Sequence, residues 1–97
     1  MKLRFSPQAT QDLIEIADYI RLENPRAAER VRASILESLQ NLAAFPRIGR
    51  RQSVEGVRKL VTRRYGYLIY YSINEPAAEI VILAVRHPAR ARPIVDV

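Results

Sequence analysis

The sequence predicts an α+β fold, in which an N-terminal strand and an antiparallel helical hairpin precede a three-stranded antiparallel meander. All the strands are expected to form one twisted sheet that the helices cover. Two successive amphipathic stretches predict the hairpin, because a junction of only a few residues joins them. Residues 67–73 (YLIYYSI) and 80–85 (IVILAV) are almost wholly apolar, which predicts central strands buried on both faces. The length of 97 residues is that of one domain, residues 1–97.

The first strand and the first helix lie at the start of the chain. Residues 2–5 (KLRF) alternate polar and apolar side chains, as a strand with one buried face does. Ser6 is suited to cap a helix that begins at Pro7 and ends near residue 22 or 23. The apolar stripe of this helix consists of Ala9, Leu13, Ile16, Ala17 and Ile20. Three acidic residues lie off the stripe and are expected to face solvent, namely Asp12, Glu15 and Asp18.

The second helix repeats the same start signal. Asn24 is suited to cap it and Pro25 to occupy its first position. Its apolar stripe consists of Ala28, Val31, Ile35, Leu39 (or Ser38) and Leu42. Its charged residues, which are expected to face outward, are Arg26, Glu29, Arg30, Arg32 and Glu37. The hairpin therefore has an apolar side that needs a surface to cover, and the later strands supply one.

The second half of the chain is predicted to be a meander. Pro46 ends the helix, Gly49 marks a turn, and residues 50–56 are expected to form a polar surface loop. The three strands are predicted at residues 57–61, 67–73 and 80–86, with connections at 62–66 and 74–78. Pro88 and Pro93 predict an irregular tail. The sequence leaves open which edge of the meander pairs with residues 2–5, and in which direction.

Charge is distributed unevenly between the two halves of the chain. The formal net charge is +6. Residues 1–46 hold six basic and six acidic side chains, whereas residues 47–97 hold ten basic and four acidic ones. Fourteen of the sixteen basic residues are arginine, which suits bidentate contact with phosphate or carboxylate. A solubilising surface, a nucleic-acid surface and a surface for an acidic protein all remain open.

Composition argues against several classes of protein and site. The chain has no cysteine and one histidine, which does not make a four-ligand metal set, so we expect no metal and no cofactor. No apolar run has the length of a signal peptide or of a membrane span. We therefore expect a soluble, cytoplasmic protein that does not contact a membrane.

A set of basic residues lies at the predicted strand ends and in the connections. It consists of Arg58, Lys59, Arg63, Arg64, Arg86, His87, Arg90 and Arg92. We expect the ends of strands 57–61 and 80–86 to converge, which would bring Arg63, Arg64, Arg86 and His87 into one patch. Arginine and tyrosine together suit RNA binding, through phosphate contact and base stacking. The tyrosines of strand 67–73 are nevertheless interpreted as core residues.

The chain resembles the RelE/ParE superfamily of toxins from type II toxin–antitoxin systems. The matching segments occur in order over nearly the whole chain. They are residues 5–9 (FSPQA), 12–13 (DL), Ile16, 19–20 (YI), 24–25 (NP), 27–28 (AA), Leu42, 45–46 (FP), 49–50 (GR), 56–60 (GVRKL), 67–71 (YLIYY) and 82–87 (ILAVRH). The resemblance implies a sheet with a helical hairpin, and a toxin silenced by an antitoxin from the same operon.

Two activities occur in this superfamily. RelE-like members cleave mRNA on the ribosome without a metal, and ParE-like members poison DNA gyrase and so block replication. RelE-like nucleases carry a segment similar to Tyr-Arg-Leu-Val-Tyr in the third strand. This chain has Leu68 in place of the arginine. They also often carry, after the last strand, an aromatic residue that acts as the general acid. No tyrosine follows Tyr71 in this chain. The ParE-like function is therefore favoured, and whether the chain is an enzyme is left open.

For the nuclease alternative, the candidate catalytic residues are Arg63, Arg64, Arg86 and His87. A non-toxic binding module is a second alternative.

The resemblance also implies the partners. The antitoxin should be a small acidic protein with a DNA-binding N-terminal domain, in a heterotetramer or larger assembly. The target should be DNA gyrase or, in the alternative, the ribosome and its mRNA. The residues expected to contact the antitoxin are Leu13, Ile16, Ile20, Arg58 and Arg64. Glutamate at both Arg58 and Arg64 should weaken the complex if charge contributes to binding.

Overall fold

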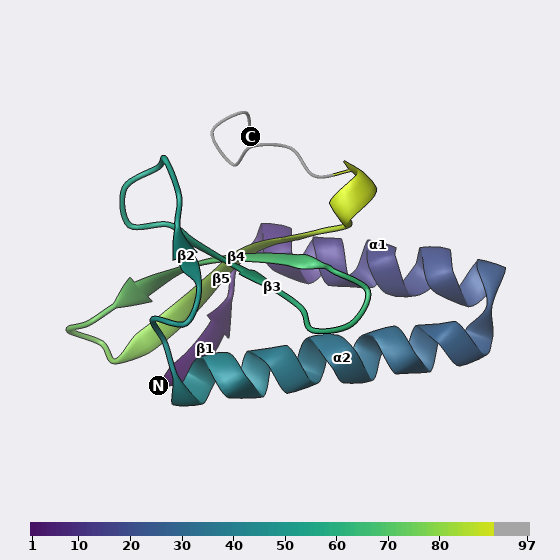
Figure 1. Ribbon diagram of the computed structural model, residues 1–97, viewed down its shortest axis with the longest axis horizontal. Helices are drawn as coiled ribbons and strands as arrows, with labels where there is room; N and C mark the ends of the chain where they lie inside the picture. The colour runs from purple at the N-terminus through teal and green to yellow at the C-terminus, as the bar shows by residue number, and fades with distance from the viewer. Residues whose placement is uncertain (91–97) are drawn as a thin grey trace.

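The computed structural model, described here for residues 1–90, is a five-stranded mixed sheet with a helical hairpin on one face (Figure 1). The elements in chain order are β1 (Lys2–Phe5), α1 (Pro7–Glu23), α2 (Pro25–Ala44), β2 (Arg50–Arg51), β3 (Arg58–Val61), β4 (Leu68–Asn74), β5 (Glu79–Arg86) and a 3-10 helix (Pro88–Arg90). The tip of the hairpin extends beyond the sheet (Figure 1). This architecture confirms the predicted α+β fold with its helical hairpin. Within residues 1–90, no helix has both the length and the apolar character needed to cross a bilayer.

Side-chain caps define the helix boundaries, as the sequence predicted. The Oγ atom of Ser6 accepts the Ala9 amide hydrogen at 3.0 Å. The Oδ1 atom of Asn24 accepts from the amides of Arg26 and Ala27 at 3.1 and 3.2 Å. The backbone amide of Asn24 also donates to Ile20 O at 2.7 Å, so one residue ends α1 and begins α2. Amides in the first turn of a helix have no partner within the helix, and these caps satisfy them.

The strand order is β1-β5-β4-β3-β2. The meander of β3, β4 and β5 is antiparallel, and β4 and β5 each have a neighbour on both sides, which confirms their predicted central position. Strand β1 pairs with β5 in parallel, from Lys2 opposite Glu79 to Phe5 opposite Ile82. Parallel strands need a long crossover, and the sequence between β1 and β5 includes the whole hairpin.

The main core lies between α2 and the sheet. It includes Val31, Ile35, Leu39 and Leu42 of α2 against Tyr67, Ile69, Tyr71, Ile80, Ile82 and Val85. Alternate residues of the strands face the other way, where Val57, Tyr70 and Ala84 form a second, smaller cluster with Val54, Leu68 and Leu83. We call this second side the open face, because no helix residue belongs to its cluster. The tyrosines of residues 67–71 are buried in the two clusters, as interpreted from the sequence.

Helix α1 corrects one prediction. Asp12 is buried, with 5% of its surface exposed, and is not at the solvent side as expected. Ala9 is buried too, whereas Ala17 of the predicted stripe is exposed and the three larger members are only partly covered. Asp12 lies three residues after Ala9 and four before Ile16, which is the spacing of one helix face. The burial of a carboxylate requires hydrogen-bond partners, and the end of β5 provides one.

Asp12 completes the edge of β5 where β1 stops. Beyond Phe5, the Ser6 amide donates to Ile82 O and the Ser6 hydroxyl donates to Leu83 O, each at 2.9 Å. The Asp12 Oδ2 atom then accepts the Val85 amide hydrogen at 2.9 Å. Helix α1 therefore substitutes for a continued strand, because the backbone of β5 would otherwise be left unpaired in the interior.

The loop predicted at residues 50–56 contains an additional strand. Strand β2 pairs antiparallel with β3, with Arg50 opposite Lys59 and Arg51 opposite Arg58. Two arginines carry no apolar alternation, so the sequence pattern gave no sign of a strand there. In the tail, Pro88 begins a 3-10 helix, and Pro93 lies outside the described residues.

Tyr71 connects the sheet to the turn that follows α2. Its hydroxyl donates to Pro46 O at 2.7 Å and accepts the Gly49 amide hydrogen at 2.9 Å. A Cβ atom at Gly49 would lie 2.6 Å from this hydroxyl, so only glycine fits. The pKa of Tyr71 is raised above its ordinary value by burial, although the Gly49 hydrogen bond and Arg58 lower it in part.

This arrangement predicts an alkaline loss of stability. A phenol whose pKa is higher in the folded state stabilises the fold fully below its unfolded pKa of about 10, and less as pH rises through the folded pKa. The free energy of unfolding should therefore fall above about pH 10. Tyr71→Phe should lower the free energy of unfolding by about 1 kcal/mol at pH 7 and flatten the alkaline fall. Urea denaturation of both proteins between pH 7 and pH 11 measures this, and parallel curves would contradict it.

Candidate functional site

The strand pairing brings the predicted strand ends together. Val61 at the end of β3 is opposite Leu68, and Leu68 is opposite Arg86 at the end of β5. The connection at residues 62–66 and the end of β5 therefore lie at the same end of the sheet, on either side of β4. Adjacent strands are about 4.8 Å apart, so these two strand ends are separated by roughly 10 Å.

The three arginines of the predicted patch have different surroundings. Arg63 and Arg64 are exposed, and the Arg64 carbonyl accepts a hydrogen bond from Ser34 of α2 at 3.2 Å. The Arg86 Nη1 atom lies 3.4 Å from Asp12 Oδ1, and the Arg86 side chain is only 20% exposed. The convergence therefore leaves Arg63 and Arg64 accessible, whereas Arg86 is engaged with α1.

The neighbouring pair Arg58 and Lys59 faces opposite sides of the sheet. Lys59 is opposite Tyr70 on the open face, next to Arg50 of β2. Arg58 is opposite Tyr71, and its Nη1 atom donates to Gly49 O at 2.8 Å and Arg47 O at 3.2 Å. Arg58 therefore stabilises the turn after α2.

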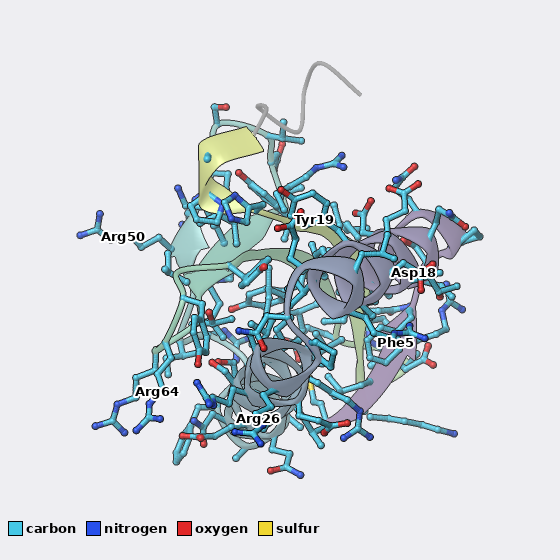
Figure 2. The ribbon with its side chains drawn as sticks, turned by 90° about the vertical axis from the view of Figure 1, so that its right-hand side faces the viewer. Phe5, Asp18, Tyr19, Arg26, Arg50 and Arg64 are labelled. Carbon is cyan, nitrogen blue, oxygen red and sulfur yellow. The ribbon has the colours of Figure 1, made fainter. Side chains whose placement is uncertain are left out.

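Strand β2 adds two cations that the sequence reasoning missed. Arg50 and Lys59 are directly opposite each other, and so are Arg51 and Arg58. Like charges in cross-strand pairs are destabilising. Positive charge is therefore concentrated at the edge of the sheet. An anionic partner bound there would offset the repulsion between these pairs. Figure 2 shows Arg50 and Arg64 extending from the same side of the molecule.

His87 follows β5, is exposed, and contacts the residue just before β4. Its ring makes an edge-to-face contact with Tyr67, with ring centroids 5.4 Å apart. Its Nδ1 atom accepts the Ala89 amide hydrogen at 3.0 Å, so the neutral ring carries its proton on Nε2. Burial, and secondarily Tyr19, raise the pKa of Tyr67, so this phenol stays protonated at neutral pH. Arg90 closes the 3-10 helix, and Arg92 lies outside the described residues.

The predicted antitoxin contacts on α1 line a groove between the two helices. The groove has a volume of about 570 Å³. Its apolar lining includes Leu13, Ile16 and Ile20 of α1, Ile35, Leu36 and Leu39 of α2, and Phe5. Arg21, Arg32 and Glu29 are its charged residues. Arg58 and Arg64, which were predicted to contact the same partner, are not among its lining residues.

This fold and sequence match known proteins. Residues 3–92 match the family model described as the ParE toxin of the type II toxin-antitoxin system parDE. The chain belongs to this family. The toxin is 34% identical over 92 residues to the Sinorhizobium fredii protein Y4kP, a match that covers 95% of the chain and 93% of the relative. It is 29% identical to toxin RelE3 of Caulobacter vibrioides, covering 93% and 97% of the two chains.

Solved structures of toxin–antitoxin systems share the fold. One is the chromosomal ParDE system of Pseudomonas aeruginosa, 28% identical with a TM-score of 0.76, covering 90% of this toxin and 95% of that chain. Another is the RelBE2 complex of Mycobacterium tuberculosis, 27% identical with a TM-score of 0.63, covering 91% of each chain. The protein is therefore a type II toxin of the RelE/ParE superfamily, and an antitoxin is its expected partner.

Proposed function

We propose that this toxin inhibits DNA gyrase in the cytoplasm and blocks replication until its antitoxin binds. The observation that carries the proposal is the surroundings of Arg86. An arginine that stabilises a scissile phosphate has to be free to reach it, but Arg86 is engaged by the buried Asp12 carboxylate. At the position where RelE-like nucleases carry an arginine, this chain has Leu68, and Leu68 packs in the cluster of the open face.

Purified gyrase tests this proposal directly. An equimolar or greater amount of toxin should inhibit supercoiling of relaxed plasmid, and addition of the antitoxin should restore it. Expression without antitoxin should induce a DNA-damage response. Normal supercoiling at toxin excess would count against gyrase as the target.

The nuclease alternative is tested on translating ribosomes. The relative RelE3 and the RelBE2 neighbour are named for the RelE branch, so toeprinting of mRNA is the matched experiment. The proposal expects no toxin-dependent cleavage, and cleavage lost in Arg63→Ala or His87→Ala would replace it by the nuclease function. Unaffected growth on overexpression would instead favour a non-toxic binding module.

We further propose that an amphipathic helix of the antitoxin occupies the groove between α1 and α2. The lining of the groove is mostly apolar, and Arg21 and Arg32 in it supply positive charge for an acidic partner. Charge reversal at Arg64 tests the electrostatic contribution. At Arg58 the same change would also remove two hydrogen bonds to the turn after α2, so a weaker complex would have two explanations.

A further inference from the structure

Four exposed arginines lie together outside the groove between the helices. Two come from α2 and two from the connection between β3 and β4, and we call them the arginine surface. Its members are Arg26, Arg30, Arg63 and Arg64. None of the four lines the groove. Within residues 1–90, none of their side chains makes an ion pair, whereas Arg21, Arg47 and Arg86 each pair with a carboxylate.

Two hydroxyl groups hold the connection against α2. The Ser34 Oγ atom of α2 donates to Arg64 O at 3.2 Å, and the Thr62 Oγ1 atom donates to the same oxygen at 2.6 Å. Figure 1 shows this connection beside α2. Arg30 and Arg26 lie four and eight positions before Ser34, so they follow it along one side of the helix at steps of about 6 Å. In Figure 2, Arg26 and Arg64 both lie on the α2 side of the molecule.

The turn that carries Arg63 and Arg64 has a fixed and unfavourable backbone conformation. Tyr65 has a φ angle of 66°, in the left-handed region that a bulky residue rarely adopts. Buried Thr62 stabilises the turn, because its Oγ1 atom also accepts the Tyr67 amide hydrogen at 3.0 Å. A turn that is already ordered loses little conformational freedom on binding, which favours a role in recognition.

The chemistry of the arginine surface favours a nucleic acid over a protein. Its cations are without carboxylate partners, and Glu37, the acid on the same side of α2, lies three positions beyond Ser34. Tyr65, 46% exposed, is the large apolar residue that the connection presents to solvent. The centre of a protein–protein interface is apolar and poor in charge, whereas protein–DNA interfaces are polar and strongly positive.

We propose that the arginine surface binds the phosphate backbone of duplex DNA without reading its sequence. The planar guanidinium group forms paired hydrogen bonds with phosphate oxygens, and a strand presents phosphates in a regular row. Such contacts carry no sequence information, so affinity should depend on salt and not on sequence. This inference goes beyond the proposed gyrase function and does not depend on it, because its test contains no gyrase.

Fluorescence anisotropy of a short labelled duplex, titrated with the purified toxin alone, tests the proposal. The antitoxin is left out because it is expected to have its own DNA-binding domain. Between about 50 and 200 mM salt the affinity should fall about 100-fold, as four phosphate contacts predict. Two duplexes of unrelated sequence should bind equally. Absence of binding at the lower salt concentration, or a strong preference for one sequence, would overturn the proposal. Tighter binding of poly-glutamate than of the duplex would assign the surface to an acidic protein instead.

Paired variants separate this surface from the general positive charge. Arg30→Ala and Arg63→Ala remove one exposed cation from each element, and Arg64 is left unchanged because it is also a predicted antitoxin contact. Each should weaken duplex binding about fivefold to tenfold and reduce the salt slope by about one. Arg47→Ala is the control, because the Arg47 side chain is 65% exposed but pairs with Glu75. Equal losses in all three variants, or unchanged affinity in both surface variants, would refute the assignment.

Discussion

Replacement of Asp12 by alanine is expected to lower the free energy of unfolding by about 3 kcal/mol. The substitution leaves the Val85 amide without its acceptor at the end of β5. It also removes the carboxylate that lies 3.4 Å from the partly buried Arg86 guanidinium. Loss of one partner of a buried polar pair costs more than the pair contributes, because the remaining group stays desolvated. Chemical denaturation followed by circular dichroism measures the change.

Asp18 provides the matched control on the same helix. Its carboxylate also pairs with an arginine, Arg21, at 2.8 Å, but both side chains are about 60% exposed to solvent, at 60% and 64%. Exposed pairs contribute little, so Asp18→Ala should change the free energy of unfolding by no more than about 0.5 kcal/mol. An Asp12→Ala loss as small as that of Asp18→Ala would show that β5 does not depend on α1 at this point.

The second large effect concerns the groove between the helices. Leu36→Glu is expected to weaken antitoxin binding by about 30-fold or more, which corresponds to about 2 kcal/mol. Leu36 lines the groove, and a charge there would be desolvated by a helix packed against it. Because Leu36 is already 46% exposed, the free toxin should fold normally. Surface plasmon resonance with the antitoxin measures the affinity.

Ile14 is the control for this variant. It lies on α1, is 49% exposed and does not line the groove. Ile14→Glu should therefore bind the antitoxin as the unmodified toxin does. Equal losses in both variants would indicate a general charge effect, and equal retention would place the antitoxin elsewhere on the surface.

Local signals in the sequence were sufficient for the order of the main elements. Ser6 with Pro7 and Asn24 with Pro25 begin the helices where the structure has them, because capping depends only on adjacent residues. The apolar runs also identified β4 and β5 as central strands. The resemblance to the superfamily rested on such segments, and the match over residues 3–92 confirms it.

The candidate site was only partly predictable. The exposed Arg63 and Arg64 were found from their place in a connection. Arg50 and Arg51 were missed as strand residues because an edge strand of two residues has no period of its own. Asp12 was missed because a buried carboxylate contradicts the usual polarity of a buried helix face, although its spacing from Ala9 and Ile16 indicated the buried side.

The sequence by itself determined the helices, their caps, the central strands and the family. The tertiary structure alone decided that β1 runs parallel to β5, that Asp12 pairs with the end of that strand, and that Arg86 is engaged while Arg64 is exposed. The physical reason is that caps and periodicity act between residues a few positions apart. The partner of a strand edge or of a buried charge, in contrast, is separated from it by 73 to 77 positions here and is set by packing.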